Sequence, residues 1–279
     1  MHIQQFSDNI IHAVQQNNAR LDGTVMRKEA MRAEAFYFNK LGAFELEQKV
    51  GRNSTTPFLD PIHSRRKLVT NPFHQGIAID AFDQSRTNIT IQPEYVKGLM
   101  KAINRKKDQI IIEASTGVAY EGKDGTTAVT FPSSQRVLVG ATGLTSDKLL
   151  AGLEILRGND VDPDEKIYCA ITAKQEMELF KDEKIINADF SRYAVLDKGI
   201  IGAWMNINFI RTEKLQVVDG DTEVLLYTEN ALGLGMLGAP IIKIAENPER
   251  SFTPTVYVHI DLGATRVEDE KIVAIACNI

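Results

Sequence analysis

Cysteine is scarce in this chain of 279 residues, which contains only Cys169 and Cys277. Two such distant cysteines do not build the disulfide framework of a small secreted protein, and neither belongs to a CxxC pair. The five histidines are never spaced like zinc ligands. We therefore predict no metal site and expect a chain suited to a reducing compartment. Cys169 lies inside the apolar run IYCAIT and is predicted to be a buried small hydrophobic residue.

Long hydrophobic runs are also missing. The longest apolar stretch covers residues 231–242, contains three glycines and a proline, and is too short to span a bilayer. The first residues, MHIQQFSDNIIHAVQQ, have neither the basic N-terminal region nor the apolar central region of a signal peptide. These absences predict a soluble intracellular protein that does not use a membrane as a partner.

The motifs of common enzyme classes are absent or lack their context. Gly233, Gly235 and Gly238 in GLGMLG match a dinucleotide fingerprint, but Pro240 and the strand-like text IIKIA follow where a helix is required. We interpret these glycines as part of a kinked strand and keep a nucleotide-binding enzyme as a rival hypothesis. There is no phosphate-binding GxxxxGK[ST] and no GxSxG. The sequence thus predicts no catalytic residue and no cofactor.

Charge is unevenly distributed along an otherwise ordinary composition of 43% hydrophobic and 25% charged residues. Residues 1–120 carry 16 Lys and Arg against 12 Asp and Glu, a net +4, whereas residues 121–279 carry 16 against 25, a net -9. Such asymmetry fits a side that faces a polyanion or head-to-tail contacts between copies, and it equally fits two solvated surfaces.

Helical and strand-like periodicity alternate along most of the chain. Apolar residues recur at helical spacing over residues 3–14 and again from Pro93 to Ser115, where Gly117 closes the longest expected helix. A further helix follows a cap at Thr145 or Ser146, with an inner face of Leu149, Leu150, Leu153 and Leu156. The remaining expected elements are strands at 36–38, 166–172 and 204–212, a short helix capped by Thr172, and strands from residue 223 onward.

The stretch from residue 48 to 86 has no such regularity. It contains Pro57, Pro61 and Pro72 and an unbroken basic run, Arg65, Arg66 and Lys67. We interpret it as an irregular insertion, a loose hairpin that returns through IAIDAF at 77–82. It is too apolar for a simple disordered linker and far longer than an ordinary connection of about 4–6 residues. Apolar and basic groups in such a segment are expected to find partners on another copy, which points to assembly rather than catalysis.

Several short sequence blocks, in a fixed order along the chain, resemble those of a known family, and this resemblance covers nearly the whole chain. They are FSDNIIHAVQQ, FYFNKLGA at 36–43, TPFLDPIHSRR at 56–66, ITAKQ at 171–175, NINFIRTEKL at 206–215 and VYVHIDLGATRVEDEKIVAIAC at 256–277. With these blocks the chain resembles tailed-bacteriophage major capsid proteins of the Hong Kong 97-like fold, especially a podovirus-type group. Specificity comes from the order of the blocks, since none of them is a catalytic signature.

The resemblance implies an α+β chain with four parts. These are an N-terminal arm at 1–39, an extended loop at 40–86, a peripheral domain at 87–143 and 216–279 with a long spine helix, and an axial α/β domain at 144–215. It also implies a subunit that assembles into pentamers and hexamers of an icosahedral shell around double-stranded DNA, in the virion after assembly in the host cytoplasm. Portal, scaffolding and decoration proteins, and packaged DNA bound without base specificity, would be its partners.

The inter-subunit contacts expected from this resemblance lie in the extended loop. Phe58 and Leu59 would supply apolar anchors, and Arg65, Arg66 and Lys67 would pair with acidic groups of a neighbour, with His63 in the same contact segment. Exposed ion pairs contribute only about 0–1 kcal/mol each, so apolar burial would carry most of the affinity. A solvated basic run remains the plain alternative. An encapsulin-type shell around a cargo enzyme is the alternative function, because it shares the capsid fold.

Overall fold

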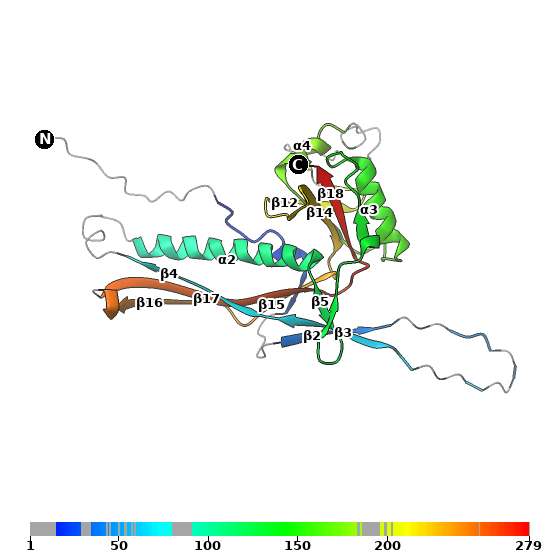
Figure 1. Cartoon of the computed structure of the whole chain (residues 1–279), viewed down its shortest axis with the longest axis horizontal. Helices are drawn as coiled ribbons and strands as arrows, with labels where there is room; N and C mark the ends of the chain where they lie inside the picture. Colours follow the sequence, from blue (N-terminus) through cyan, green and yellow to red (C-terminus); the bar gives the residue numbers. More distant parts are fainter. Residues whose placement is uncertain are drawn as a thin grey trace.

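The structure is a computed structural model of the whole chain, and it is described here for most but not all residues. The described residues are 15–28, 35–42, 44, 46–49, 51–52, 55–56, 58, 60–79, 91–182, 185, 196–197, 200–201, 203–250 and 252–278. Figure 1 shows an elongated molecule in which a helix-covered ribbon of strands lies below a more compact α/β body.

Local sequence signals mark the starts of α3 and α4 and the end of α2, while α2 begins two residues before the expected Pro93. Helix α2 is the longest, α3 starts at a Thr145 cap whose side chain accepts a hydrogen bond from the Lys148 N–H, and α4 starts at Thr172 with a capping box. Gly117 ends α2: its N–H donates to the Glu113 carbonyl, and a Cβ at this position would collide with that oxygen. The bounds are Ile91–Thr116 for α2, Ser146–Gly158 for α3 and Ala173–Leu179 for α4, with 3-10 turns at Asp22–Thr24, Ser133–Gln135 and Pro248–Arg250.

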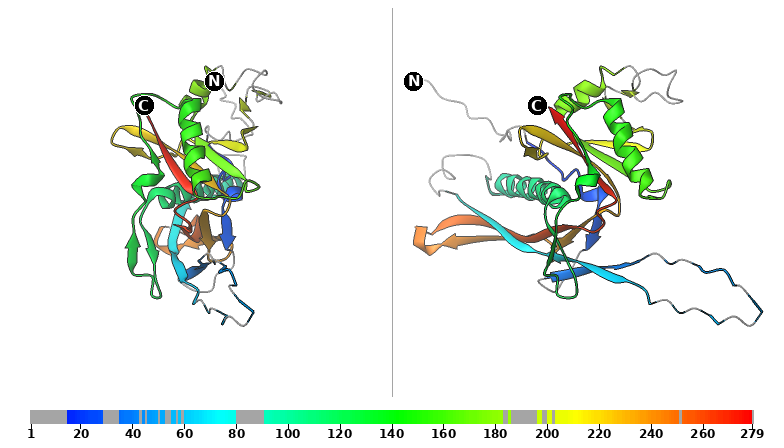
Figure 2. Two further views of the ribbon diagram at one scale, coloured as in Figure 1. Left: turned by 90° about the vertical axis from the view of Figure 1, so that its right-hand side faces the viewer. Right: turned by 45° about the vertical axis from the view of Figure 1, so that its right-hand side comes forward.

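The compact body is built on a seven-stranded sheet with the order β11-β12-β8-β14-β18-β7, in which β13 also pairs with β14. Helix α3 covers one face of this sheet, where Gly152 lets the helix approach Leu226 and Ile275 closely (Figure 2). The bounds are Ala203–Trp204 for β11, Ile207–Arg211 for β12, Ile167–Ile171 for β8, Asp221–Thr228 for β14, Ile272–Asn278 for β18, Arg136–Val137 for β7 and Val217–Val218 for β13.

The long ribbon forms a second sheet along which α2 lies (Figure 1). Its central strand, β17, pairs with β15 through its second half and with β4 and β16 through its first half. Val256, Val258 and Ile260 alternate onto the face that packs against Leu99 and Ile103 of α2. The bounds are Met26–Lys28 for β1, which pairs with β15, Leu232–Met236 for β15, Thr253–Arg266 for β17, Ile241–Asn247 for β16 and Asn71–Ala78 for β4.

A third sheet carries a long hairpin that projects from the molecule at the end opposite to the tip of β16 and β17 (Figure 1). Its order is β2-β3-β5-β6, and β2 and β3 pair antiparallel along their full length. The bounds are Ala35–Leu41 for β2, His63–Val69 for β3, Ala119–Glu121 for β5 and Thr127–Val129 for β6; a separate pair joins β9 at Leu196–Asp197 to β10 at Ile200–Ile201. We call residues 42–62 the hairpin loop.

Most of the expected elements are confirmed. The long helix, the capped helices, the strand at 36–38, the strands at 167–171 and 207–211, and the strand rather than helix after GLGMLG are all present. The described strands and helices together form the expected α+β fold. Leu150 is an exception within α3, because it is exposed rather than on the inner face. The predicted helix at 3–14 lies outside the described residues.

One expectation about chain organisation is corrected, and a strand pairing bears on another. The supposed irregular insertion contains two regular strands, β3 and β4, and Ile77 and Ala78 end a strand that pairs with β17 instead of closing a loose hairpin. The strands β14 and β18, expected in the peripheral part at 216–279, pair with β8 and with each other in the compact body. The division of the chain into peripheral and axial domains otherwise stays a prediction.

Candidate inter-subunit contact site

The hairpin loop exposes large apolar side chains that have no place in either core. Phe58 is 96% exposed, Leu46 is 99% exposed and Ile62 is 79% exposed, and Phe44 is also mostly in solvent. A folded chain covers such groups where it can, because each buried Leu, Ile or Phe side chain contributes about 1.5–3 kcal/mol. Several of them together on one projecting loop are typical of a surface that binds another molecule.

The residues predicted to make the contact fall on this loop and on the strand that follows it. Phe58 lies in the loop, and His63 is the exposed first residue of β3. Leu59 lies outside the described residues. Arg65 is exposed beside them, with its guanidinium 5.7 Å from the centre of the Tyr37 ring. Phe58, His63 and Arg65 are therefore available to a neighbour.

Lys67 is half-buried, because its side chain packs against the turn that joins β5 and β6. A Cβ built on Gly125 in that turn, where the backbone φ is +63°, would meet the Lys67 side-chain carbons. The aliphatic part of the lysine thus covers this turn. Lys67 supports the base of the hairpin as well as adding positive charge.

The predicted contact between Arg66 and a neighbouring subunit is corrected. Arg66 is only 4% exposed and is paired within its own chain. Its Nη2 atom lies 2.6 Å from Asp269 Oδ2 and 3.6 Å from Glu121 Oε2. The reason is the alternation of a β-strand: Arg66 and the buried Leu68 lie on one face of β3, while Arg65 lies on the other. Arg66 is thus a structural residue of the hairpin base.

A second buried arginine completes this cluster, which we define as Arg66, Arg266, Asp269 and Glu121. Arg266 is fully buried and its Nε donates to Asp269 Oδ1. Its other nitrogens donate to backbone carbonyls of Ser115, Gly117 and Val129. One arginine therefore joins the end of α2, the end of β17 and the strand β6. The sequence shows no signal for the pairing of Arg66 with Asp269, because these two residues are 203 positions apart.

One glycine of the false dinucleotide motif, Gly233, has a steric role, and so does Gly263 in the neighbouring strand. A Cβ on Gly233 would collide with the ring of Phe38, and a Cβ on Gly263 would collide with the Val69 carbonyl. Both glycines lie in the paired strands β15 and β17 where the hairpin strands cross over them. Close backbone approach, rather than phosphate binding, accounts for their position.

Neither a metal centre nor a reactive thiol is found in the described part of the chain. Among the described residues, no group of three or more His, Cys, Asp or Glu side chains could hold a metal ion. Cys169 and Cys277 are both buried, and burial raises the pKa of both thiols, that of Cys277 to about 12. No helix within the described ranges is long and apolar enough to cross a membrane.

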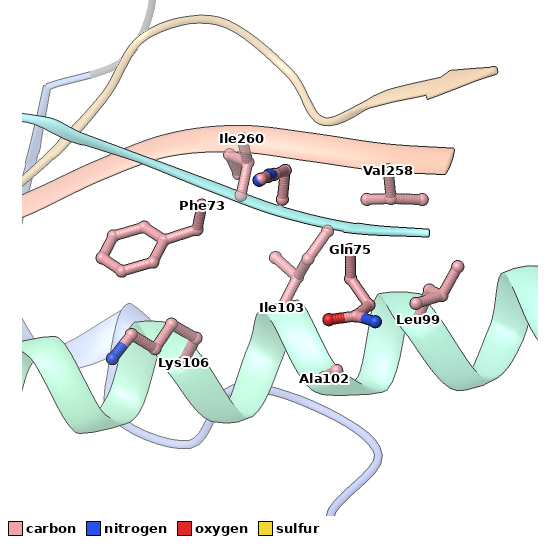
Figure 3. A pocket seen from close by; sticks show the side chains of 9 residues that line it. Phe73, Gln75, Leu99, Ala102, Ile103, Lys106, Val258 and Ile260 are labelled. Atoms are coloured by element: carbon pink, nitrogen blue, oxygen red, sulfur yellow. The ribbon is translucent and has the colours of Figure 1, made fainter. Parts of the chain in front are cut away.

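One apolar groove opens beside α2, between this helix and the strands β4 and β17 (Figure 3). Its volume is about 140 Å³. Lys106 lies at one end, with its Nζ atom 4.9 Å from the centre of the Phe73 ring. We call this the α2 groove; its lining is Phe73, His74, Gln75, Leu99, Ala102, Ile103, Lys106, Val258 and Ile260.

Comparison with solved structures identifies the fold. The capsid of cyanophage P-SCSP1u matches with a TM-score of 0.78 at 12% identity, covering 99% of this chain and 93% of that one. Mycobacterium phage Che8 matches with a TM-score of 0.76 at 14% identity, covering 98% and 96%. The capsid of Ralstonia phage GP4 matches with a TM-score of 0.74 at 11% identity, covering 99% and 95%. The architecture is therefore the Hong Kong 97-like fold.

The sequence itself matches the family described as "Phage capsid protein" over residues 1–279. No curated protein matches the chain significantly. The chain belongs to the phage capsid protein family. Within that family it is a major capsid protein, a structural protein of the virion capsid, and the encapsulin alternative is not favoured.

Proposed function

We propose that this capsid protein assembles into pentamers and hexamers of a closed icosahedral shell that encloses phage double-stranded DNA. The observation that carries the proposal is the hairpin loop, whose apolar side chains are exposed in the single chain. A surface that binds a different patch on the next copy is heterologous, and such contacts close into rings when the rotation between copies allows it. The role is architectural and needs no catalytic residue or cofactor.

In this proposal each part of the chain has a place in the shell. Residues 1–39 form an arm across neighbouring subunits, and the extended loop at 40–86 reaches over the adjacent subunit. The peripheral domain contains α2, and the axial domain, whose tips meet at the fivefold and sixfold axes, contains α3 and β8. The pairing of β14 and β18 with β8 supports moving these two strands from the peripheral to the axial domain.

Phe58, Leu59 and His63 would form the contact together with Arg65 and the ammonium group of Lys67. The apolar groups would provide most of the affinity, since exposed ion pairs contribute only about 0–1 kcal/mol each. Arg65 and Lys67 would select an acidic surface and orient the loop on it.

The proposed partners beyond the chain itself are portal, scaffolding and decoration proteins and the packaged DNA. Contact with DNA would depend on phosphate charge and carry no base specificity. The net charge of -5 favours a weak contact, as a container that later releases its DNA requires. Assembly would take place in the cytoplasm of the bacterial host.

Electron microscopy of the recombinant protein tests the proposal, alone and with lysate from infected cells. Closed polyhedral shells, rings or tubes are the expected result for the unmodified chain. A double variant, Phe58→Ala with Arg65→Ala, is expected to lose assembly while its thermal unfolding stays unchanged. Monomers or dimers from the unmodified chain, with every phage factor supplied, would overturn the proposed function.

A matched double variant separates this effect from a general loss of surface groups. Leu138→Ala with Arg157→Ala removes one exposed apolar and one exposed basic side chain from the compact body. It is expected to retain more assembly than the loop variant. Equal assembly by the loop variant and the unmodified chain would remove Phe58 and Arg65 from the proposed contact.

A further inference from the structure

The α2 groove has the size and chemistry to hold one aromatic ring. Its volume is about 140 Å³, and an apolar cavity of about 150 Å³ lined by similar side chains accepts benzene. Most of the surface inside the groove is apolar, and Figure 3 shows the side chains of α2 facing those of β4 and β17 across it. The apolar walls are Phe73, Leu99, Ala102, Ile103, Val258 and Ile260.

The chain carries a matching ring in Phe58, which is almost fully exposed on the hairpin loop. Phe58 does not reach the groove of its own chain. The extended run from His63 to Phe73 already spans roughly 33 Å, and the loop continues from His63 in the direction away from the groove (Figure 1). A contact between the ring and the groove must therefore join two copies.

Charges beside the ring and beside the groove are complementary. Asp60 lies two residues after Phe58 and is exposed, so the loop presents a carboxylate close to the ring along the chain. Lys106 stands at one end of the groove over the Phe73 ring, and among the described residues it makes no ion pair. A ring seated in the groove brings the carboxylate of Asp60 within reach of this ammonium group.

We propose that Phe58 of one copy inserts into the α2 groove of a second copy, where Asp60 pairs with Lys106. This inference rests on the proposed function, and it names the receptor for the hairpin loop. Phe58 and the groove are different surfaces at different ends of the ribbon, so the contact is heterologous. Each copy offers one ring and one groove, and successive copies join head to tail.

A pair of introduced cysteines, Asp60→Cys with Lys106→Cys, tests the contact while it leaves Phe58 in place. Assembled particles of the full chain are oxidised and then separated under denaturing, non-reducing conditions. A ladder of covalent multimers that ends at the pentamer and hexamer is the expected result. The native thiols do not interfere, because Cys169 and Cys277 are both buried and have raised pKa values.

Further variants assign the ladder to the ring and the groove. Ala102→Trp fills the groove, and Phe58→Ser removes the ring; each, added to the cysteine pair, is expected to reduce the ladder tenfold or more. The control pair, Asp60→Cys with Leu138→Cys, is expected to give no ladder. A mixture of the two single-cysteine chains is expected to give dimers and nothing larger, because each chain then has one reactive position.

The outcomes separate this inference from the proposed function. Normal shells of the cysteine pair without a ladder would overturn the docking of the loop in the groove, with assembly itself intact. A ladder that ends at the dimer would overturn the head-to-tail geometry. Failure of the unmodified chain to assemble would overturn the proposed function first, and this inference with it.

A charge exchange provides a test that needs no oxidation. Asp60→Lys and Lys106→Asp are each expected to raise the protein concentration required for assembly by about two- to fivefold, as the loss of one exposed ion pair allows. The double exchange is expected to restore it, because the pair is re-formed with opposite polarity. Additive losses in the double variant would exclude contact between the two positions.

Discussion

The base and the loop of one hairpin illustrate opposite uses of similar residues. At the base, Phe38, Arg66 and Leu68 are buried and packed against the rest of the chain. In the loop, Phe58 and Ile62 are exposed to solvent. The difference shows that residue type alone does not reveal an assembly surface. The base has its partners within the chain, whereas we propose that the loop finds its partners on another copy.

The largest expected effect comes from Asp269, the shared acidic partner of two buried arginines at the base. Asp269→Ala would leave Arg66 and Arg266 without their main counter-charge. Breaking a buried pair in this way costs about 3–5 kcal/mol of the free energy of unfolding, measured by urea denaturation. Glu121→Gln, which alters the more distant and more exposed partner of Arg66, should cost much less. Equal small losses would show that the base is held by packing alone.

Gly263→Ala should give the next largest effect, because the added methyl group would collide with the Val69 backbone carbonyl. We expect a loss of about 3 kcal/mol, at the upper end for overpacking, since a backbone atom cannot rotate away. Gly76→Ala is the matched control in the same sheet, where the nearest atoms are 3.9 Å away. It should leave the midpoint of thermal unfolding unchanged or raise it.

A partly buried ion pair sharpens the contrast with the buried cluster. Lys271 Nζ lies 2.6 Å from Glu165 Oε1. Burial acts to raise the pKa of Glu165, but the hydrogen bond and the positive charge of Lys271 oppose it, and the pKa is lowered. A lowered carboxyl pKa adds stability that is present at neutral pH and is lost as the pH falls below about 4.5. Glu165→Gln should therefore cost about 1 kcal/mol at pH 7, and this cost should shrink progressively as the pH falls below about 4.5.

The smallest expected effect on stability is that of Phe58→Ser in the loop. The side chain is exposed, so its removal should change the free energy of unfolding by no more than about 0.5 kcal/mol, measured on the unassembled chain. The same variant should be strongly impaired in assembly. A large loss of stability would show that Phe58 packs within its own chain and would remove the contrast between base and loop.

Local elements could be predicted from the sequence where one short-range pattern determines them. The long helix follows from apolar spacing and the Gly117 stop, and α4 follows from Thr172 and Gln175, whose side chain accepts the Thr172 N–H at 2.9 Å. The strands β3 and β4 were not predicted, because prolines interrupt the strand pattern in this part of the sequence. In addition, β4 is paired with β17, about 180 positions further along the chain. Strand propensity does not reveal such distant partners.

The candidate site was predicted only in outline. The exposed positions of Phe58, His63 and Arg65 agree with a contact segment, although their partner stays a proposal. Arg66 was misplaced because three adjacent basic residues were treated as one surface. The alternation along β3 places Arg66 on the same face as the buried Leu68, and this alternation can be recognised in the sequence. The pairing of Arg66 with Asp269 cannot be recognised there, because the two residues are far apart in the chain.

The hairpin loop also has a consequence for how such a subunit can change over generations. The strands β2 and β3 are held by their own pairing and by the base, and the closure entropy of the loop between them grows only slowly with its length. Doubling a flexible loop costs only about 0.6 kcal/mol. Insertions and deletions there are therefore nearly neutral for folding. In the proposed shell, a lineage could adjust the reach between subunits, and with it the curvature of the shell, without rebuilding either core.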